Sequence, residues 1–166
     1  MQNNDSLVRL RNLLISLAVF AALVLYAATY AEPVLRVSVM PDQPPPVLRR
    51  KLEPLIDYLG KRVGIKMEFR PMLSGDTLVD ALLRHKLDLV WIDGANLARA
   101  RLRKDGQVIP LVRLEAGDYA WAVRADMDAN LRQKLTDAFL SLSRDSSPGR
   151  EILDMQHVHR YIPAGR

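Results

Sequence analysis

The chain has 166 residues, of which 49% are hydrophobic and 26% are charged, a composition typical of a single globular domain. Its formal net charge is +5, but the basic residues do not gather with aromatic ones, which argues against a nucleic-acid-binding protein. The sequence contains no cysteine, which excludes disulfides, thiolate nucleophiles and cysteine-based metal sites.

The first part of the chain predicts a membrane anchor. Residues 13–31 carry no charge and follow Arg9 and Arg11. As a helix this segment would reach about 28 Å, close to the thickness of a bilayer core. The basic flank predicts a cytoplasmic N-terminus, residues 1–12, and an extracytoplasmic domain, residues 32–166. Small residues at Thr29 and Ala31 leave a cleaved signal peptide as the alternative, although the apolar core is long for one.

The remainder of the chain alternates between two kinds of pattern. Strands are predicted where short apolar or β-branched runs end at turn residues: Leu35–Met40, Ile65–Met72, Leu89–Ile92, Val108–Leu114 and Tyr119–Val123. Helices are predicted where apolar residues recur every three or four positions: Val47–Val63, a segment after Ser74, a segment after Asp93, Ala129–Arg144 and a short segment Arg150–Met155.

This alternation is typical of a parallel sheet with helices on both faces. We therefore expect a three-layer α/β domain. Ligands of such sheets usually lie at the carboxyl edge of the strands, beside the helix N-termini. The turn Asp93-Gly94, which follows the most apolar strand, is the first place to look for a site.

Three blocks of sequence resemble a known family. They are LRVSVMPDQPPPVLRRKLEPLIDYLGKRVGIKMEF, DLVWIDGANLARA and YAWAVRADMDANLRQKLTDAFLSLSRDSSPGREIL. In this order, and over nearly the whole chain after the apolar segment, they resemble the phosphonate, phosphite and phosphate substrate-binding proteins of ABC importers. The resemblance implies the type 2 periplasmic binding protein fold, in which two α/β lobes close around a solute.

The resemblance also implies that one lobe is missing. In the family, the second lobe is inserted between the strands that here end at Leu114 and begin at Tyr119, and only Glu115–Asp118 separates them. The family's phosphate cradle of serine and threonine hydroxyls belongs to that second lobe. We therefore expect a truncated, single-lobe form of the fold.

The remaining half of the family's site also differs from its pattern. The family's Gly-Pro turn and its ligand-contacting tyrosine correspond here to Asp93, Gly94 and Leu97. Carboxylates at this edge, Asp93 together with Asp42 and Asp76, are expected to repel a phosphonate.

The candidate ligand-binding residues lie at the predicted strand edge: Asp42, Ser74, Thr77, Asp93 and Asn96. Ordinary helix capping is the alternative for Ser74 and Asp93. His157 and His159 would share one face of a strand, as metal ligands do, but the sequence offers no third ligand, and we expect no metal. No nucleophile is paired with a base, so we expect neither catalytic residues nor a cofactor.

Two functions remain open. In the first, a lobe anchored in the bacterial inner membrane, with its C-terminal domain in the periplasm, has lost solute capture and serves as an accessory or interaction subunit of a membrane complex. In the second, it is the solute-binding component of an ABC importer for a phosphonate, a phosphate or another small solute, as a homodimer or beside a separate lobe. An acidic strand edge disfavours an oxyanion but tolerates a cationic or neutral solute.

Overall fold

The computed structural model describes residues 9, 11–21, 33–103 and 108–165. The chain divides into two compact units, Met1–Pro33 and Val34–Arg166. In the first unit residues 11–21 are helical, and the rest of the predicted anchor, residues 22–31, lies outside the described residues. Among the residues that are described, no helix is both long enough and apolar enough to cross a membrane. The anchor therefore stays a prediction.

The second unit is built on one six-stranded sheet with the strand order β2-β1-β3-β5-β4-β6. Its strands are β1 (Val34–Val39), β2 (Lys66–Phe69), β3 (Leu89–Ile92), β4 (Val108–Leu114), β5 (Ala120–Arg124) and β6 (Tyr161–Pro163). β1 pairs in parallel with β2 and β3. β5 lies antiparallel to β3 and β4, and β6 lies antiparallel to β4. The expectation of a parallel sheet is therefore correct for the first three strands and wrong for the sheet as a whole.

The hairpin between β4 and β5 explains the change of direction. Glu115–Asp118 form a bend, and the Leu114 N–H donates to the Tyr119 carbonyl oxygen at 3.2 Å. So short a connection can only return the chain antiparallel, whereas a parallel return needs a crossover of about a dozen residues or more. The place where the resemblance puts a second lobe is thus a closed turn.

The helices are α2 (Pro45–Val63), α3 (Gly75–Leu83), α4 (Gly94–Leu102), α5 (Ala129–Leu140) and α6 (Ser147–Met155). All of them were expected, with differences at their ends. α5 stops at Leu140 rather than Arg144. α6 begins earlier than expected because Ser146 caps it and Pro148 falls in its first turn, where a missing N–H costs nothing.

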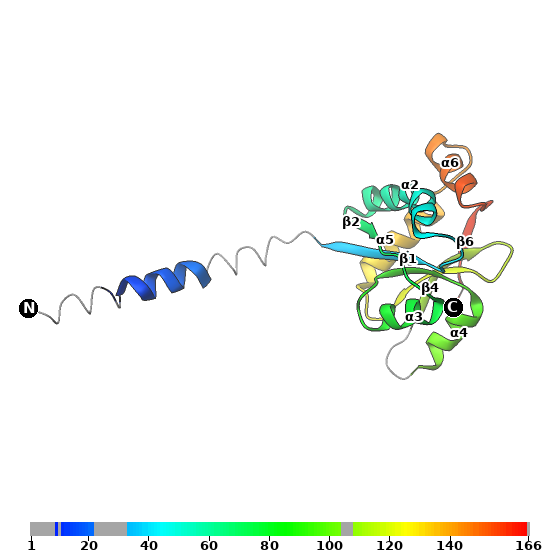
Figure 1. Ribbon diagram of the computed structural model, residues 1–166. Coiled ribbons are helices and arrows are strands. Elements are labelled where there is room, and N and C mark those ends of the chain that lie inside the picture. The colour runs from blue at the N-terminus through cyan, green and yellow to red at the C-terminus, as the bar shows by residue number, and fades with distance from the viewer. Residues whose placement is uncertain (1–8, 10, 22–32, 104–107, 166) are drawn as a thin grey trace, which may run out of the picture. The chain divides into compact units, whose positions relative to one another are not determined.

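Helices cover both faces of the sheet (Figure 1). α2, α5 and α6 pack on one face, over a core that includes Trp121 and Phe139. α3 and α4 pack on the other, over Val90, Ile92 and Ala122. Because successive residues of a strand point to opposite faces, Trp91 lies on the side of α2 and its neighbours Val90 and Ile92 lie on the side of α3. The three-layer α/β arrangement is confirmed.

The amino edge of the central strands is held by a buried carboxylate, Asp88, whose residue is 7% exposed. Asp88 accepts from the Arg36 backbone N–H at 2.9 Å and from the Arg36 guanidinium at 2.8 and 3.1 Å. The Arg124 guanidinium lies 3.6 Å from the same carboxylate and donates to the Leu87 carbonyl oxygen at 2.7 Å. These contacts join the starts of β1 and β3 to the end of β5.

Candidate ligand-binding edge of the sheet

The candidate site lies at the opposite edge of the sheet, where β1 and β3 end. Because β5 runs antiparallel to β3, with Ala120 opposite Ile92, the start of β5 also lies at this edge. The helices α2, α3 and α4 follow β1, β2 and β3 and begin here. This is the position at which the open sheets of α/β proteins hold their ligands.

Asp93 and Asn96 bond to one another at the start of α4. The Asp93 carboxylate accepts from the Asn96 backbone N–H at 2.7 Å and from the Asn96 side-chain amide at 3.0 and 3.1 Å. Asn96 is buried. The capping role predicted for Asp93 is therefore confirmed, and the carboxylate places a full negative charge at the helix N-terminus that would otherwise attract an anion.

The cap at Asp93 predicts a graded response to mutation. Asp93→Ala should lower the free energy of unfolding by about 1 kcal/mol, because the Asn96 amide and N–H lose their acceptor. Asp93→Asn should lower the free energy of unfolding by only about 0.3 kcal/mol, since asparagine caps a helix almost as well without the charge. Urea unfolding of the full chain in mild detergent measures both, and equal losses in the two variants would contradict a role through capping.

Ser74 and Thr77 form a closed capping box at the start of α3. The Thr77 N–H donates to Ser74 Oγ at 3.3 Å, and the Ser74 N–H donates to Thr77 Oγ1 at 3.1 Å. A methyl group on Gly75 would come within 2.7 Å of Met40 Cε and 3.1 Å of Asn96 Nδ2. The starts of α3 and α4 therefore converge closely on Met40, and the candidate hydroxyls serve the helix.

Asp42 belongs, together with Asp93, to an acidic group around Tyr119. Partial burial raises the pKa of the Tyr119 phenol, and the charges of Asp93, Asp118 and Asp42 raise it further. Gly94 packs against Asp118, since a methyl group there would lie 3.2 Å from a carboxylate oxygen. The expected acidic edge therefore exists. It also includes Asp118 from the β4–β5 turn, which was not among the expected residues.

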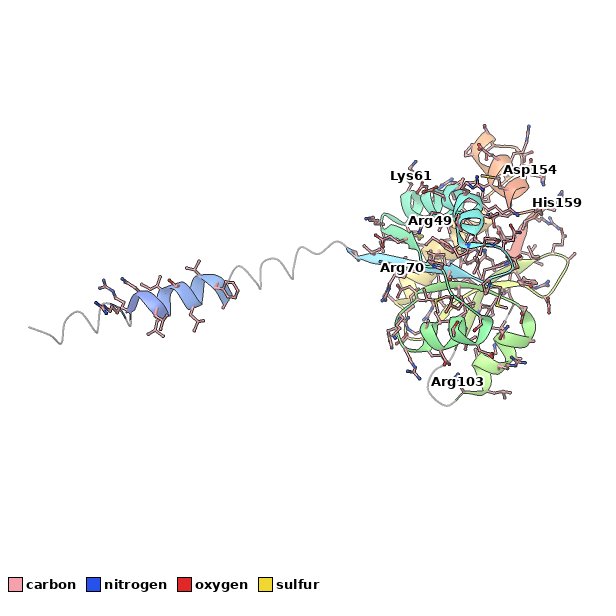
Figure 2. All side chains as sticks on the ribbon, viewed as in Figure 1. Arg49, Lys61, Arg70, Arg103, Asp154 and His159 are labelled. Carbon is pink, nitrogen blue, oxygen red and sulfur yellow. The ribbon has the colours of Figure 1, made fainter. Side chains whose placement is uncertain are left out.

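Asp76, which we expected among the repelling carboxylates, has a cationic partner. Its carboxylate lies 3.3 Å from the Arg99 guanidinium. Arg103 likewise pairs with Asp80, and Figure 2 shows Arg103 on the α4 side of the sheet, away from Asp154 on α6. The end of α4, with Arg99 and Arg103, thus pairs with two carboxylates of α3.

A pocket of about 300 Å³ opens at the same edge on the side of α2 and α6. Asp42 lines it together with Lys51, Trp91 and Tyr119. The Trp91 and Tyr119 rings stack, with centroids 5.6 Å apart and planes 25° apart. The sequence reasoning missed these three side chains. Trp91 is the one partly exposed residue of β3, and this property appears only in the structure.

The two C-terminal histidines do not lie on a strand, where their spacing of two would put both on one face. They fall in the turn between α6 and β6, and His157 has a positive φ of 55°. The described part of the chain contains no group of three side chains that could hold a metal ion.

Solved structures with the same fold support this description of the lobe. The PhnD1 protein of Prochlorococcus marinus, in complex with methylphosphonate, matches with a TM-score of 0.72 and 15% identity over 79% of this chain and 92% of that one. A binding component of a phosphonate ABC transporter from Pseudomonas aeruginosa matches with a TM-score of 0.68 and 8% identity, covering 80% and 82%. A protein of Xanthomonas citri, solved with ATP, matches with a TM-score of 0.64 and 12% identity, covering 80% and 91%. At these identities the likeness shows the fold.

Family membership comes from the sequence itself. No curated protein matches the chain. Residues 37–119, half of the chain, match the family described as ABC transporter, phosphonate, periplasmic substrate-binding protein. The matched segment runs from β1 to the turn before β5 and includes the candidate edge with Asp42, Ser74, Thr77, Asp93 and Asn96. The chain therefore belongs to the periplasmic phosphonate substrate-binding protein family of ABC transporters.

Proposed function

We propose that this protein is an accessory subunit of a membrane complex, a single periplasmic lobe anchored by residues 13–31 that has lost the capture of phosphonate. The family is that of substrate-binding transport components, which supports a periplasmic location for residues 32–166, a transporter as the partner complex and a role that is not enzymatic. Residues 1–12 would then lie in the cytoplasm.

One observation carries this proposal: the helix N-termini at the candidate edge are poorly suited to an oxyanion. α2 begins with Pro45 and Pro46, which have no N–H, and the Val47 N–H already donates to the Pro44 carbonyl at 2.9 Å. At the start of α3, Ser74 and Thr77 bond to each other in a capping box. At the start of α4, the Asp93 carboxylate caps the helix. An anion bound by helix N-termini needs free N–H groups and no competing negative charge.

The closed hairpin at Glu115–Asp118 supports the same conclusion. A solute held by one lobe stays open to water on its far side, where hydrogen bonds and ion pairs are weak. A lobe of this kind is better suited to contact a protein surface than to retain a solute by itself.

A second function is favoured by the pocket at Trp91 and Tyr119. A concave site with aromatic walls and a few charged groups is the usual form of a small-molecule site. The protein would then be the solute-binding component of an importer, either for a phosphonate-like or another small solute, and a homodimer or a separate lobe would supply the other half of the cleft.

Native mass spectrometry of the untagged protein, extracted from its own membranes in mild detergent, separates the two functions. The accessory role predicts an uncleaved N-terminus and foreign subunits at fixed stoichiometry. A cleaved, soluble monomer or homodimer would overturn it and support the receptor. The intact mass of the chain reports cleavage directly, so the anchor is tested in the same experiment.

A further inference from the structure

The pocket beside Trp91 is lined by residues of both charges. It lies between the start of α2, the ends of β1 and β3, and the turn that follows α6. Asp42 and Tyr119 both line it, and the Asp42 charge contributes to the raised pKa of the Tyr119 phenol. Lys51 and His157 also line it, and the Gln156 side chain donates to the Lys51 carbonyl oxygen at 2.6 Å, which holds the turn after α6 against α2.

The aromatic wall of the pocket is held from behind. The Trp91 ring stacks on Tyr119, and its centroid lies 5.3 Å from that of Trp121 and 6.0 Å from that of Tyr161. Trp121 and Tyr161 are buried in the core. A ring supported in this way keeps its position without a ligand, and aromatic rings attract an ammonium group.

The charges in this pocket are unpaired. Over the described residues, neither the Asp42 carboxylate nor the Lys51 ammonium takes part in a salt bridge, and they do not pair with each other although both line the pocket. Asp93 and Asp118 add negative charge on the side of Tyr119. A simple cation would meet Lys51, and a simple anion would meet Asp42, whereas a molecule with both charges would pair with each of them.

We infer that this pocket binds a small zwitterion, an aminocarboxylate or a betaine, with its ammonium group at Asp42, Trp91 and Tyr119 and its carboxylate at Lys51. The volume of about 300 Å³ suits a solute of amino-acid size. This site is independent of the accessory role, because a subunit of a complex can carry it as well as a receptor can. It also differs from capture of a phosphonate by the N–H groups of helix N-termini, because its charged groups are side chains.

Isothermal titration calorimetry on the purified full chain in mild detergent tests the site. The probes are β-alanine, γ-aminobutyrate and glycine betaine, with butyrate and butylamine as analogues that keep one charge, and methylphosphonate as the oxyanion. At least one zwitterion should bind about tenfold or more tightly than either single-charge analogue, since each analogue leaves one ion pair unmade. Failure of all three zwitterions, equal binding of an analogue, or tighter binding of methylphosphonate would overturn the inference.

Variants locate the binding within the pocket. Asp42→Asn and Lys51→Gln should each weaken the best zwitterion by about tenfold, because each removes one charge from the pair. Asp57→Asn and Lys61→Gln are matched controls on exposed positions of α2, and Figure 2 shows Lys61 at the surface. If the pocket variants bind as tightly as the controls, the ligand sits elsewhere and the assignment is wrong. The mass-spectrometric result for the accessory role is unaffected by either outcome.

Discussion

The Asp88→Ala variant should lower the free energy of unfolding by about 2–3 kcal/mol, because it removes a buried carboxylate and leaves its partner Arg36, whose side chain is 36% exposed, without an acceptor. Asp88 accepts hydrogen bonds from the backbone and the guanidinium of Arg36, and Arg124 approaches it from β5. The hydrogen bond to Asp88 raises the pKa of Arg36. A guanidinium is charged at neutral pH with or without such a partner, so the variant leaves a cation without its acceptor. The variant therefore weakens the contacts that join β1, β3 and β5.

Asp126→Ala is the matched control for this variant. Asp126 also contacts Arg124, at 3.0 Å, but its side chain is 58% exposed. Exposed ion pairs contribute about 1 kcal/mol or less, so this variant should lie close to the parent chain. Urea unfolding in mild detergent measures both. Similar losses in the two variants, or a loss below about 1 kcal/mol for Asp88→Ala, would mean that the Asp88 contacts do not hold this edge of the sheet.

Much of the fold could be predicted because local patterns decide it. The helices α3, α4, α5 and α6 each begin after a residue whose side chain caps them. Three of these residues could be recognised from sequence alone, Ser74 and Asp93 as caps and Ser146 as a helix break. The strand Leu89–Ile92 has the predicted bounds because a short apolar run between polar residues has few other solutions. Elements of this kind are fixed by neighbours in the chain.

Strand direction and the last strand required information from distant residues. The alternation of Trp121 and Val123 is the same in a parallel and an antiparallel strand, so the pattern predicted β5 but not its place between β3 and β4. β6 has three residues, too few for a periodic signal, and it forms because Ile162 and Tyr161 pair with Arg113 and Leu114. Such pairing appears only when the sheet is assembled.

The candidate site was also predicted only in part. The edge itself was predicted, because the carboxyl ends of parallel strands always meet there. Two pairs of candidate residues hydrogen-bond to each other, Ser74 with Thr77 and Asp93 with Asn96. The residues of each pair are three positions apart, a spacing that already allowed these bonds. Lys51 and Tyr119 come from segments far apart in the sequence and meet only through the crossover of α2 and the β4–β5 hairpin. Long-range contacts of this kind leave no local pattern.

The stability of the lobe should fall at alkaline pH because of Tyr161, the tyrosine at the centre of the aromatic core. Burial raises the pKa of Tyr161 to about 12, and the hydrogen bond from Trp121 Nε1 at 3.4 Å offsets only part of that effect. In the unfolded chain the phenol ionises near its ordinary pKa of about 10. Between these two values the unfolded state releases a proton that the folded state keeps, so the free energy of unfolding decreases as the pH rises.

The expected loss is about 1.4 kcal/mol by about pH 11 and about 2–3 kcal/mol once both states are ionised. Tyr161→Phe removes this dependence, so the difference in stability between the parent chain and this variant should shrink, or change sign, from about pH 9 to about pH 11. Tyr58→Phe, which removes a hydroxyl bonded to Ser141 near the surface, is the matched control and should follow the parent chain. Urea unfolding at a series of pH values measures all three. Parallel curves for the parent chain and Tyr161→Phe would show that the phenol is not held in its neutral form by the core, because a group with equal pKa values in both states contributes no pH dependence.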